Sequence, residues 1–200
     1  MNAETTDQII RIVRRLGIVR PKDMDEHGIH RKYVQELYSL GLLRRIGRGL
    51  YTLPETEPSE NRSLAEASKQ VSSGIICLLS ALRFHGLTTQ SPYEIWMAID
   101  HKARSPRDLG IPIRIARYSG QALTSGVEQH TIEGVTVRVY DPAKTVADCF
   151  KFRNKIGLDV AIEALRDCHR TSKCTMDDLW KYAKICRVAN IMKPYLESVV

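Results

Sequence analysis

The sequence lacks the features that would place the chain in a membrane or on a secretory route. No apolar run approaches the roughly 20 residues that a helix needs to span a bilayer. The first residues are polar and acidic, so we expect no signal peptide. Internal repeats and low-complexity tracts are also missing. The expected location is the cytoplasm, with no membrane contact.

Motifs of common enzyme classes are missing as well. The chain has no glycine-rich phosphate loop, no nucleophile elbow and no His-Glu-x-x-His zinc motif. Five cysteines are present without a Cys-x-x-Cys pair, and Cys168, His169 and Cys174 lack the paired spacing of a zinc site. We therefore expect no metal and no cofactor. Most of the cysteines fall on apolar helical faces, where a reduced thiol behaves as a small hydrophobic group.

The chain does have an excess of positive charge, concentrated near its start. Lysine and arginine outnumber aspartate and glutamate by 30 to 23, a net charge of +7. Residues 1–54 hold ten basic and six acidic residues, and the rest of the chain holds twenty and seventeen. A basic balance points to a polyanionic partner, although charge alone does not decide this. The 43% hydrophobic content suffices for one large or two small cores.

The first 40 residues predict three short helices on the scale of a helix-turn-helix. Residues 9–16 carry apolar side chains at helical spacing, and Gly17 ends that helix. Proline favours a second short helix over residues 21–28, with Met24 as its main core contact. A third helix is predicted over about residues 30–40.

The next segment predicts a β-hairpin, or wing. Residues 41–54 read Gly-Leu-Leu-Arg-Arg-Ile-Gly-Arg-Gly-Leu-Tyr-Thr-Leu-Pro, two apolar runs joined by a Gly-Arg-Gly turn. Gly47 and Gly49 are expected to supply the positive φ angles of a tight hairpin. Tyr51 is expected to pack against the first helix. Three helices followed by such a hairpin are typical of a winged helix-turn-helix.

The exposed side of the third helix and the wing carry residue types that contact DNA. Arginine and lysine reach guanine edges or phosphates, and glutamine can pair with adenine. Wing arginines can meet backbone phosphates or enter the minor groove. A merely solvated basic face would explain the third helix alone, but the wing beside it favours DNA. The predicted DNA-binding residues are Arg31, Lys32, Gln35, Arg44, Arg45 and Arg48.

Residues 55–60, Glu-Thr-Glu-Pro-Ser-Glu, predict a linker between a DNA-binding domain at 1–54 and a second domain at 61–200. The predicted fold class is α+β: an N-terminal winged helix-turn-helix followed by a mixed α+β domain with a helical C-terminal end. The second domain is predicted to begin with two helices, from residue 61 or 63 to 72 and over 75–84. Four strands follow, over 93–99, 113–116, 128–132 and 135–140. Four more helices are predicted over 141–152, 158–169, 175–186 and 188–199.

Three features define the ends of these later helices. Asp141 is a predicted cap, followed by a first-turn proline at Pro142. Thr175 is a second predicted cap, with acidic residues in the first turn after it. The last helix is expected to kink or restart at Pro194.

Two segments resemble one protein family. His30-Arg-Lys-Tyr-Val-Gln-Glu-Leu, with the wing at 41–54, is similar to the N-terminal domain of AbiEi-type antitoxins. The segment 131–150, Thr-Ile-Glu-Gly-Val-Thr-Val-Arg-Val-Tyr-Asp-Pro-Ala-Lys-Thr-Val-Ala-Asp-Cys-Phe, resembles the same family. The six predicted DNA-binding positions carry over directly. Where a small helix-capping residue is expected, the chain has His30, which we expect to weaken the cap of the third helix.

The resemblance implies a type IV toxin–antitoxin, or abortive-infection, system of phage defence. The winged domain would repress its own operon, and the C-terminal domain would counter a nucleotidyltransferase-type toxin encoded beside it. The implied partners are double-stranded operator DNA and that toxin. Neutralisation would proceed either through direct contact or by opposing the toxin's modification without contact.

Two alternatives remain beside this non-enzymatic repressor and antitoxin. A plain winged-helix transcription factor would lack the antitoxin role. A Mg²⁺-dependent nuclease would use Asp100 and Lys102 at the end of an apolar strand that also carries Glu94, but such sites need a second acidic strand. Residues 75–92 instead predict helix and loop.

His85 is expected to interact with a helix dipole, and the basic residues between 151 and 173 form either a solvated surface or a patch for toxin or DNA.

Overall fold

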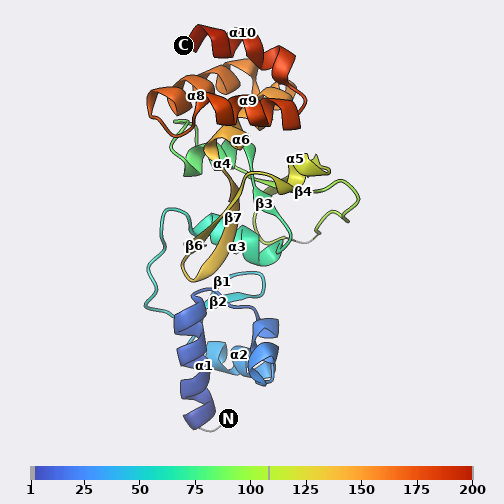
Figure 1. Cartoon of the computed structure of the whole chain (residues 1–200). Coiled ribbons are helices and arrows are strands. Elements are labelled where there is room, and N and C mark those ends of the chain that lie inside the picture. The colour runs from blue at the N-terminus through green and yellow to red at the C-terminus, as the bar shows by residue number, and fades with distance from the viewer. Residues whose placement is uncertain (1–2, 108, 200) are drawn as a thin grey trace. The chain divides into compact units, whose positions relative to one another are not determined.

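The computed structural model describes residues 3–107 and 109–199 (Figure 1). Apart from the four residues outside these ranges, the chain divides into two compact units. Among the described residues, unit 1 comprises 3–72, 106–107, 109–111 and 130–137, and unit 2 comprises 73–105, 112–129 and 138–199. The α+β class is confirmed. Unit 1 includes the predicted linker and residues 61–72, so the domain boundaries at 54 and 61 stay predictions.

Unit 1 begins with three helical segments and a hairpin, in the predicted order. They are followed by one further helix. The elements are α1 (Ala3–Leu16), the 3₁₀ helix η1 (Pro21–His27), α2 (Lys32–Ser39), β1 (Arg44–Gly47), β2 (Leu50–Thr52) and α3 (Arg62–Gln70).

The core of unit 1 is built from the apolar positions that the sequence pattern indicates. Ile9 and Val13 on α1 and Met24 on η1 are completely buried, as are two residues of α2. Tyr51 on β2 is 5% exposed and belongs to the same core; its ring lies 5.8 Å from that of Tyr38 on α2, and its packing against the first helix stays a prediction. Gly17 ends α1 with a φ of +65°, and a Cβ there would collide with the Glu133 carbonyl group. Glycine is therefore required at this position by its backbone angle and by close chain approach.

The β-sheet has the strand order β5-β4-β3-β7-β6. Its central strand, β3, pairs antiparallel with β4 and parallel with β7, while β4 and β5 are parallel. The tip of the β6–β7 hairpin, residues 130–137, falls in unit 1. The strands are β3 (Ile75–Ile76), β4 (Ile95–Asp100), β5 (Ile113–Tyr118), β6 (Val127–Ile132) and β7 (Val135–Tyr140).

The helices of unit 2 pack around α6, which contacts α4, α8 and α9 (Figure 1). Asp141 caps α6 by accepting the Lys144 backbone N–H at 2.7 Å, and Thr175 caps α9 in a capping box with Asp178, both as predicted. The helices are α4 (Leu78–Phe84), α5 (Gln121–Thr124), α6 (Pro142–Lys151), α7 (Arg153–Ile156), α8 (Leu158–Arg170), α9 (Met176–Ile185) and α10 (Ala189–Val199). No helix in the described ranges is both long and apolar enough to cross a membrane.

One sequence-based expectation for unit 2 is wrong. The predicted helix over 75–84 begins as strand β3, because a continuous apolar run does not distinguish a strand from a buried helix. Helix α10 runs through Pro194 without restarting, so of the two outcomes expected there only a kink stays a prediction; buried Met192 and Leu196 flank the proline. Cys77, Cys149 and Cys186 are buried free thiols, in line with the expectation for most of the cysteines, and Cys168 and Cys174 form a disulfide that was not predicted.

The interior of unit 2 contains a fully buried ion pair between Lys144 and Asp148, one turn apart on α6. The Lys144 ammonium also lies 3.9 Å from the ring centroid of Tyr140, and the Cys186 thiol donates to Asp148 at 3.2 Å. Burial raises the pKa of the Asp148 carboxyl, although Lys144 opposes that rise. Desolvation therefore outweighs attraction, and we expect the pair to add little net stability while being costly to break.

Breaking this pair should destabilise the protein strongly. Asp148→Ala leaves the ammonium buried without a carboxylate, so the free energy of unfolding should fall by about 3–5 kcal/mol. The double variant Lys144→Met, Asp148→Leu should recover most of this loss. Urea denaturation followed by circular dichroism measures both. Lys193 and Glu197 share the spacing but are 61% and 62% exposed, so Glu197→Ala is the control and should have little effect. A loss no larger than the control's would contradict the prediction.

Candidate nucleic-acid interface

The predicted reading helix, α2, begins beside a histidine. The Nδ1 atom of His30 accepts the Lys32 backbone N–H at 3.1 Å, and the His30 carbonyl accepts the Tyr33 N–H. One of the N–H groups that a helix start leaves without an intrahelical partner is thus bonded to a side chain. The capping residue itself is Arg31, whose side chain makes no capping hydrogen bond, so the expectation of a weakened cap stays a prediction.

Arg31, directly before α2, is held by an acidic partner. Its guanidinium forms hydrogen bonds to both carboxylate oxygens of Asp25 on η1. Hydrogen bonding from Arg31 is the main cause that lowers the pKa of the Asp25 carboxyl. Both side chains are solvent-accessible, at 62% and 46% exposed. The guanidinium is fixed in position at the surface while part of its charge is neutralised.

Gln35 and Lys32 lie on the exposed side of α2. The Gln35 side-chain oxygen accepts a hydrogen bond from the Tyr51 hydroxyl at 3.1 Å, which turns the amide nitrogen away from the core. An amide oxygen has a second lone pair, so this bond leaves room for the bidentate pairing that adenine requires. The Lys32 ammonium lies over the Tyr33 ring at 5.2 Å.

The wing is the hairpin β1–β2, with Arg48 and Gly49 at its turn. Gly49 has a φ of +67°, as predicted, but Gly47 is not among the glycines with positive φ, so that expectation is wrong. A bulge between Arg45 and Gly47 shifts the strand register and replaces the second positive angle. Arg45 pairs across the hairpin with Tyr51, the residue that contacts Gln35. The Arg45 side chain therefore lies on the face of the hairpin that meets α2.

Two of the wing arginines are bonded to backbone carbonyls. The Arg44 guanidinium donates to the Thr56 carbonyl at 2.8 Å, and Arg45 Nε donates to the Gly47 carbonyl at 3.1 Å. Both residues remain exposed. These bonds do not neutralise the guanidinium charges, because a carbonyl carries no net charge.

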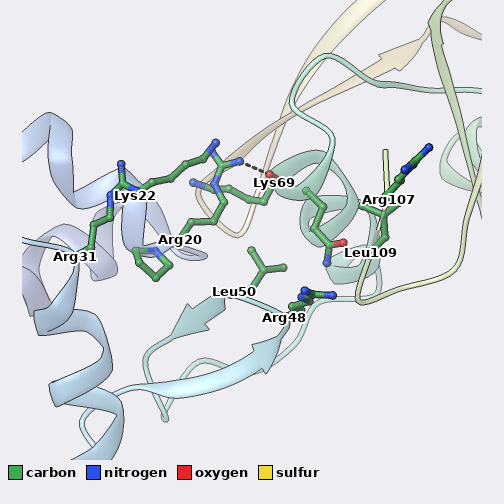
Figure 2. Close-up of a pocket in the computed structure, with 11 residues that line it drawn as sticks. Arg20, Lys22, Arg31, Arg48, Leu50, Lys69, Arg107 and Leu109 are labelled. Atoms are coloured by element: carbon green, nitrogen blue, oxygen red, sulfur yellow. Dashed lines mark hydrogen bonds between the residues drawn. The ribbon is translucent and has the colours of Figure 1, made fainter. Parts of the chain in front are cut away.

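A basic hollow of about 420 Å³ lies beside the wing (Figure 2). Its apolar wall includes Leu50, and Gln70 contributes an amide. In the close-up, Arg20, Lys22 and Arg31 lie on one side, Arg48 of the wing and Arg107 lie on the other, and Lys69 of α3 lies between them. These cationic side chains all line the hollow.

One buried carboxylate holds part of this hollow together. Asp23 accepts hydrogen bonds from the Arg20 backbone N–H, from Arg20 Nε and from Lys69 Nζ, the last at 2.8 Å. Arg20 also donates to the Lys69 carbonyl, drawn as a dashed line in Figure 2. Burial alone would raise the pKa of the Asp23 carboxyl, but the Lys69 and Arg20 hydrogen bonds bring it below its usual value.

Four cationic residues of the hollow were not predicted from the sequence. Arg20 and Lys22 flank Pro21 and could have been found from the charge count of the first module. Lys69 and Arg107 could not, because they reach the wing only through tertiary packing. The Gly110 N–H donates to Gln70 Oε1 at 3.0 Å and thereby holds the 106–111 loop against α3.

The residues of the nuclease alternative serve other contacts. The Asp100 carboxylate accepts the Lys102 backbone N–H at 2.8 Å, and Glu94 lies 3.4 Å from the Arg114 guanidinium. The neighbouring strand β3 consists of two isoleucines. No cluster of three or more histidine, cysteine or acidic side chains suited to a metal occurs in residues 3–107 and 109–199.

Removing the Asp23 charge should weaken the fold of unit 1 in a pH-dependent way. A carboxyl whose folded pKa is lowered stabilises the protein above its unfolded pKa, and that contribution disappears as pH falls through the folded value. Asp23→Asn should therefore cost about 1–3 kcal/mol at pH 7. The difference from the parent protein should shrink below about pH 4, the region of an ordinary aspartate pKa.

Urea denaturation at pH 7, 5 and 3 measures this effect. Asp7→Asn, at an exposed acid of α1, is the matched control and should change little at any pH. A pH-independent loss for Asp23→Asn would show that the carboxylate acts through shape rather than charge.

Comparisons with known proteins support the fold and identify the first module. A Mycobacterium tuberculosis protein solved as "Crystal structure of RV2827C protein" has the same fold: it is 13% identical, with a TM-score of 0.59, over 89% of this chain and 70% of that one. Among curated proteins, no sequence matches the chain. Residues 7–54, which contain α2, the wing and all six predicted DNA-binding residues, match the family model described as "Transcriptional regulator, AbiEi antitoxin".

Proposed function

We propose that the chain is a DNA-binding regulator that represses its own operon and acts as the antitoxin to a nucleotidyltransferase-type toxin in the cytoplasm. The observation that carries the proposal is the family match over residues 7–54. The exposed side of α2 and the turn of the wing lie within this match, and so do four of the six cations of the hollow.

Repression in this proposal is steric. Helix α2 enters the major groove, where Gln35 and Lys32 reach base edges. The bound protein then prevents RNA polymerase from occupying the operator. Arg48 and the cations of the hollow bind phosphates, which sets the register of the protein on the duplex without reading sequence. The Tyr51 hydroxyl orients the Gln35 amide, so the base-reading group is partly organised before DNA arrives.

A winged-helix transcription factor without an antitoxin role is the second candidate, because the family match ends at residue 54. The two candidates differ in one observable. An antitoxin protects cells that express the toxin from the neighbouring gene, and a plain transcription factor does not.

Binding to operator DNA should depend steeply on salt. If about five phosphates are neutralised, the logarithm of the affinity should fall with the logarithm of salt concentration at a slope of roughly −4 to −5. The slope can be measured by fluorescence anisotropy with a duplex from the region upstream of the gene, at salt concentrations from about 50 to about 200 mM. A nearly flat response would rule out phosphate contacts as the main source of affinity.

Substitutions should separate phosphate contact from base reading. Arg48→Ala should weaken binding to all duplexes alike and lower the salt slope by about 1. Gln35→Ala should instead cost about 1–3 kcal/mol at one base pair and relax sequence preference there. Neither should alter rescue from the toxin if neutralisation resides in residues beyond 60.

The exposed Lys181 on α9 is the control position, and Lys181→Ala should change neither property. Unchanged sequence preference in Gln35→Ala would mean that α2 presents a different face to the bases.

A further inference from the structure

Unit 2 carries a second basic hollow, with a volume of about 460 Å³. One wall is formed by the turn after β5, residues 119–120, with the first two residues of α5, and another by the end of α9 with Arg187, two residues beyond it. Three cationic side chains line it: Lys151, the last residue of α6, Lys184 on α9 and Arg187 after α9. Residues 119–122 add the Ser119 hydroxyl and the Gln121 amide as hydrogen-bond donors.

The cations of this hollow are not neutralised by carboxylates, although the Lys151 ammonium also lies 5.5 Å from the Tyr118 ring centroid. None of its lining residues is acidic. Among the ion pairs of residues 3–107 and 109–199, none includes Lys151, Lys184 or Arg187, whereas Arg170 and Lys193 in the same unit are paired with carboxylates. Three like charges facing one space repel each other, so an anion that enters it relieves repulsion and gains attraction.

Arg187 has a backbone angle that favours glycine. Its φ is +61°, in the position just after the helix end where glycine is the usual residue. A non-glycine residue in the left-handed region is strained, so backbone geometry does not account for arginine here. The side chain, which lines the hollow, is the feature that arginine adds.

We propose that this hollow binds the diphosphate or triphosphate group of a small ligand such as a nucleotide. Its volume falls within the roughly 300–1,000 Å³ of small-molecule sites. Lysine binds phosphate as a point charge, and arginine binds it through two parallel N–H donors (bidentate). Three cations can therefore contact two or three linked phosphate groups. Only Ala122 and Ile185 provide apolar wall, so recognition is directed at the phosphates rather than at a base. The site is independent of DNA binding by residues 7–54.

Isothermal titration calorimetry of the full chain with sodium triphosphate, GTP and ATP tests the proposal. All three should bind, with sulfate at equal ionic strength competing poorly. Lys184→Ala and Arg187→Gly should each weaken triphosphate binding by about tenfold or more, the usual effect of losing a charge-assisted hydrogen bond. Arg187→Gly should keep or raise the melting temperature, because glycine relieves the backbone strain. Loss of binding in a variant that folds at least as well separates ligand contact from structural damage.

Lys181→Ala is the charge-matched control, since Lys181 lies one turn before Lys184 on α9 but does not line the hollow. It should bind triphosphate like the parent protein. Absence of triphosphate binding, equal weakening in Lys181→Ala, or equal competition by sulfate would each overturn the proposal. So would loss of operator binding in Arg187→Gly without triphosphate binding in the parent, because the hollow would then belong to a DNA surface.

Discussion

The basic surface of unit 1 depends on one carboxylate. Asp23 is 11% exposed and accepts hydrogen bonds from Arg20 and from Lys69, which are 49 residues apart in the sequence. Without a buried anion there, the two cations would face each other at close range, and like charges repel strongly where water is partly excluded. Asp23 therefore lets Arg20 and Lys69 lie close together in the absence of any bound anion.

The two buried aspartates show that burial alone does not determine what a carboxylate contributes. Asp148 is fully buried beside the Lys144 ammonium, which itself lies over two tyrosine rings, and the pKa of Asp148 rises. Asp23 lies nearer the surface and accepts several charge-assisted hydrogen bonds, and its pKa falls. Hydrogen bonds to the charged form offset desolvation in the second case and not in the first. Asp148 therefore specifies which groups meet inside unit 2, whereas Asp23 stabilises the charged state.

The sequence predicts local structure well where a local physical cause exists. The helical spacing of residues 9–16, the cap at Thr175 and the proline after Asp141 each act within a few residues, and the structure has helices at all three places. Strand β3 was missed because its pairing partners, Ala98 and Val139, lie far away in sequence. Lys69 and Arg107 were missed for the same reason. The hydrogen bond from the Lys32 N–H to the His30 imidazole was not predicted either.

The predicted DNA-binding residues differ in the hydrogen-bond partners that a DNA phosphate or base would have to displace. Arg31 already binds a carboxylate, so a phosphate has to compete with Asp25 or share the guanidinium with it. Arg44 and Arg45 are bonded to neutral carbonyls, which a phosphate can replace with a net electrostatic gain. Gln35 keeps its Tyr51 bond and still presents an amide, so base reading requires no rearrangement of the helix. In the proposed complex, affinity would then arise mainly from the wing and the hollow, and Gln35, which Tyr51 orients, would contribute to sequence preference.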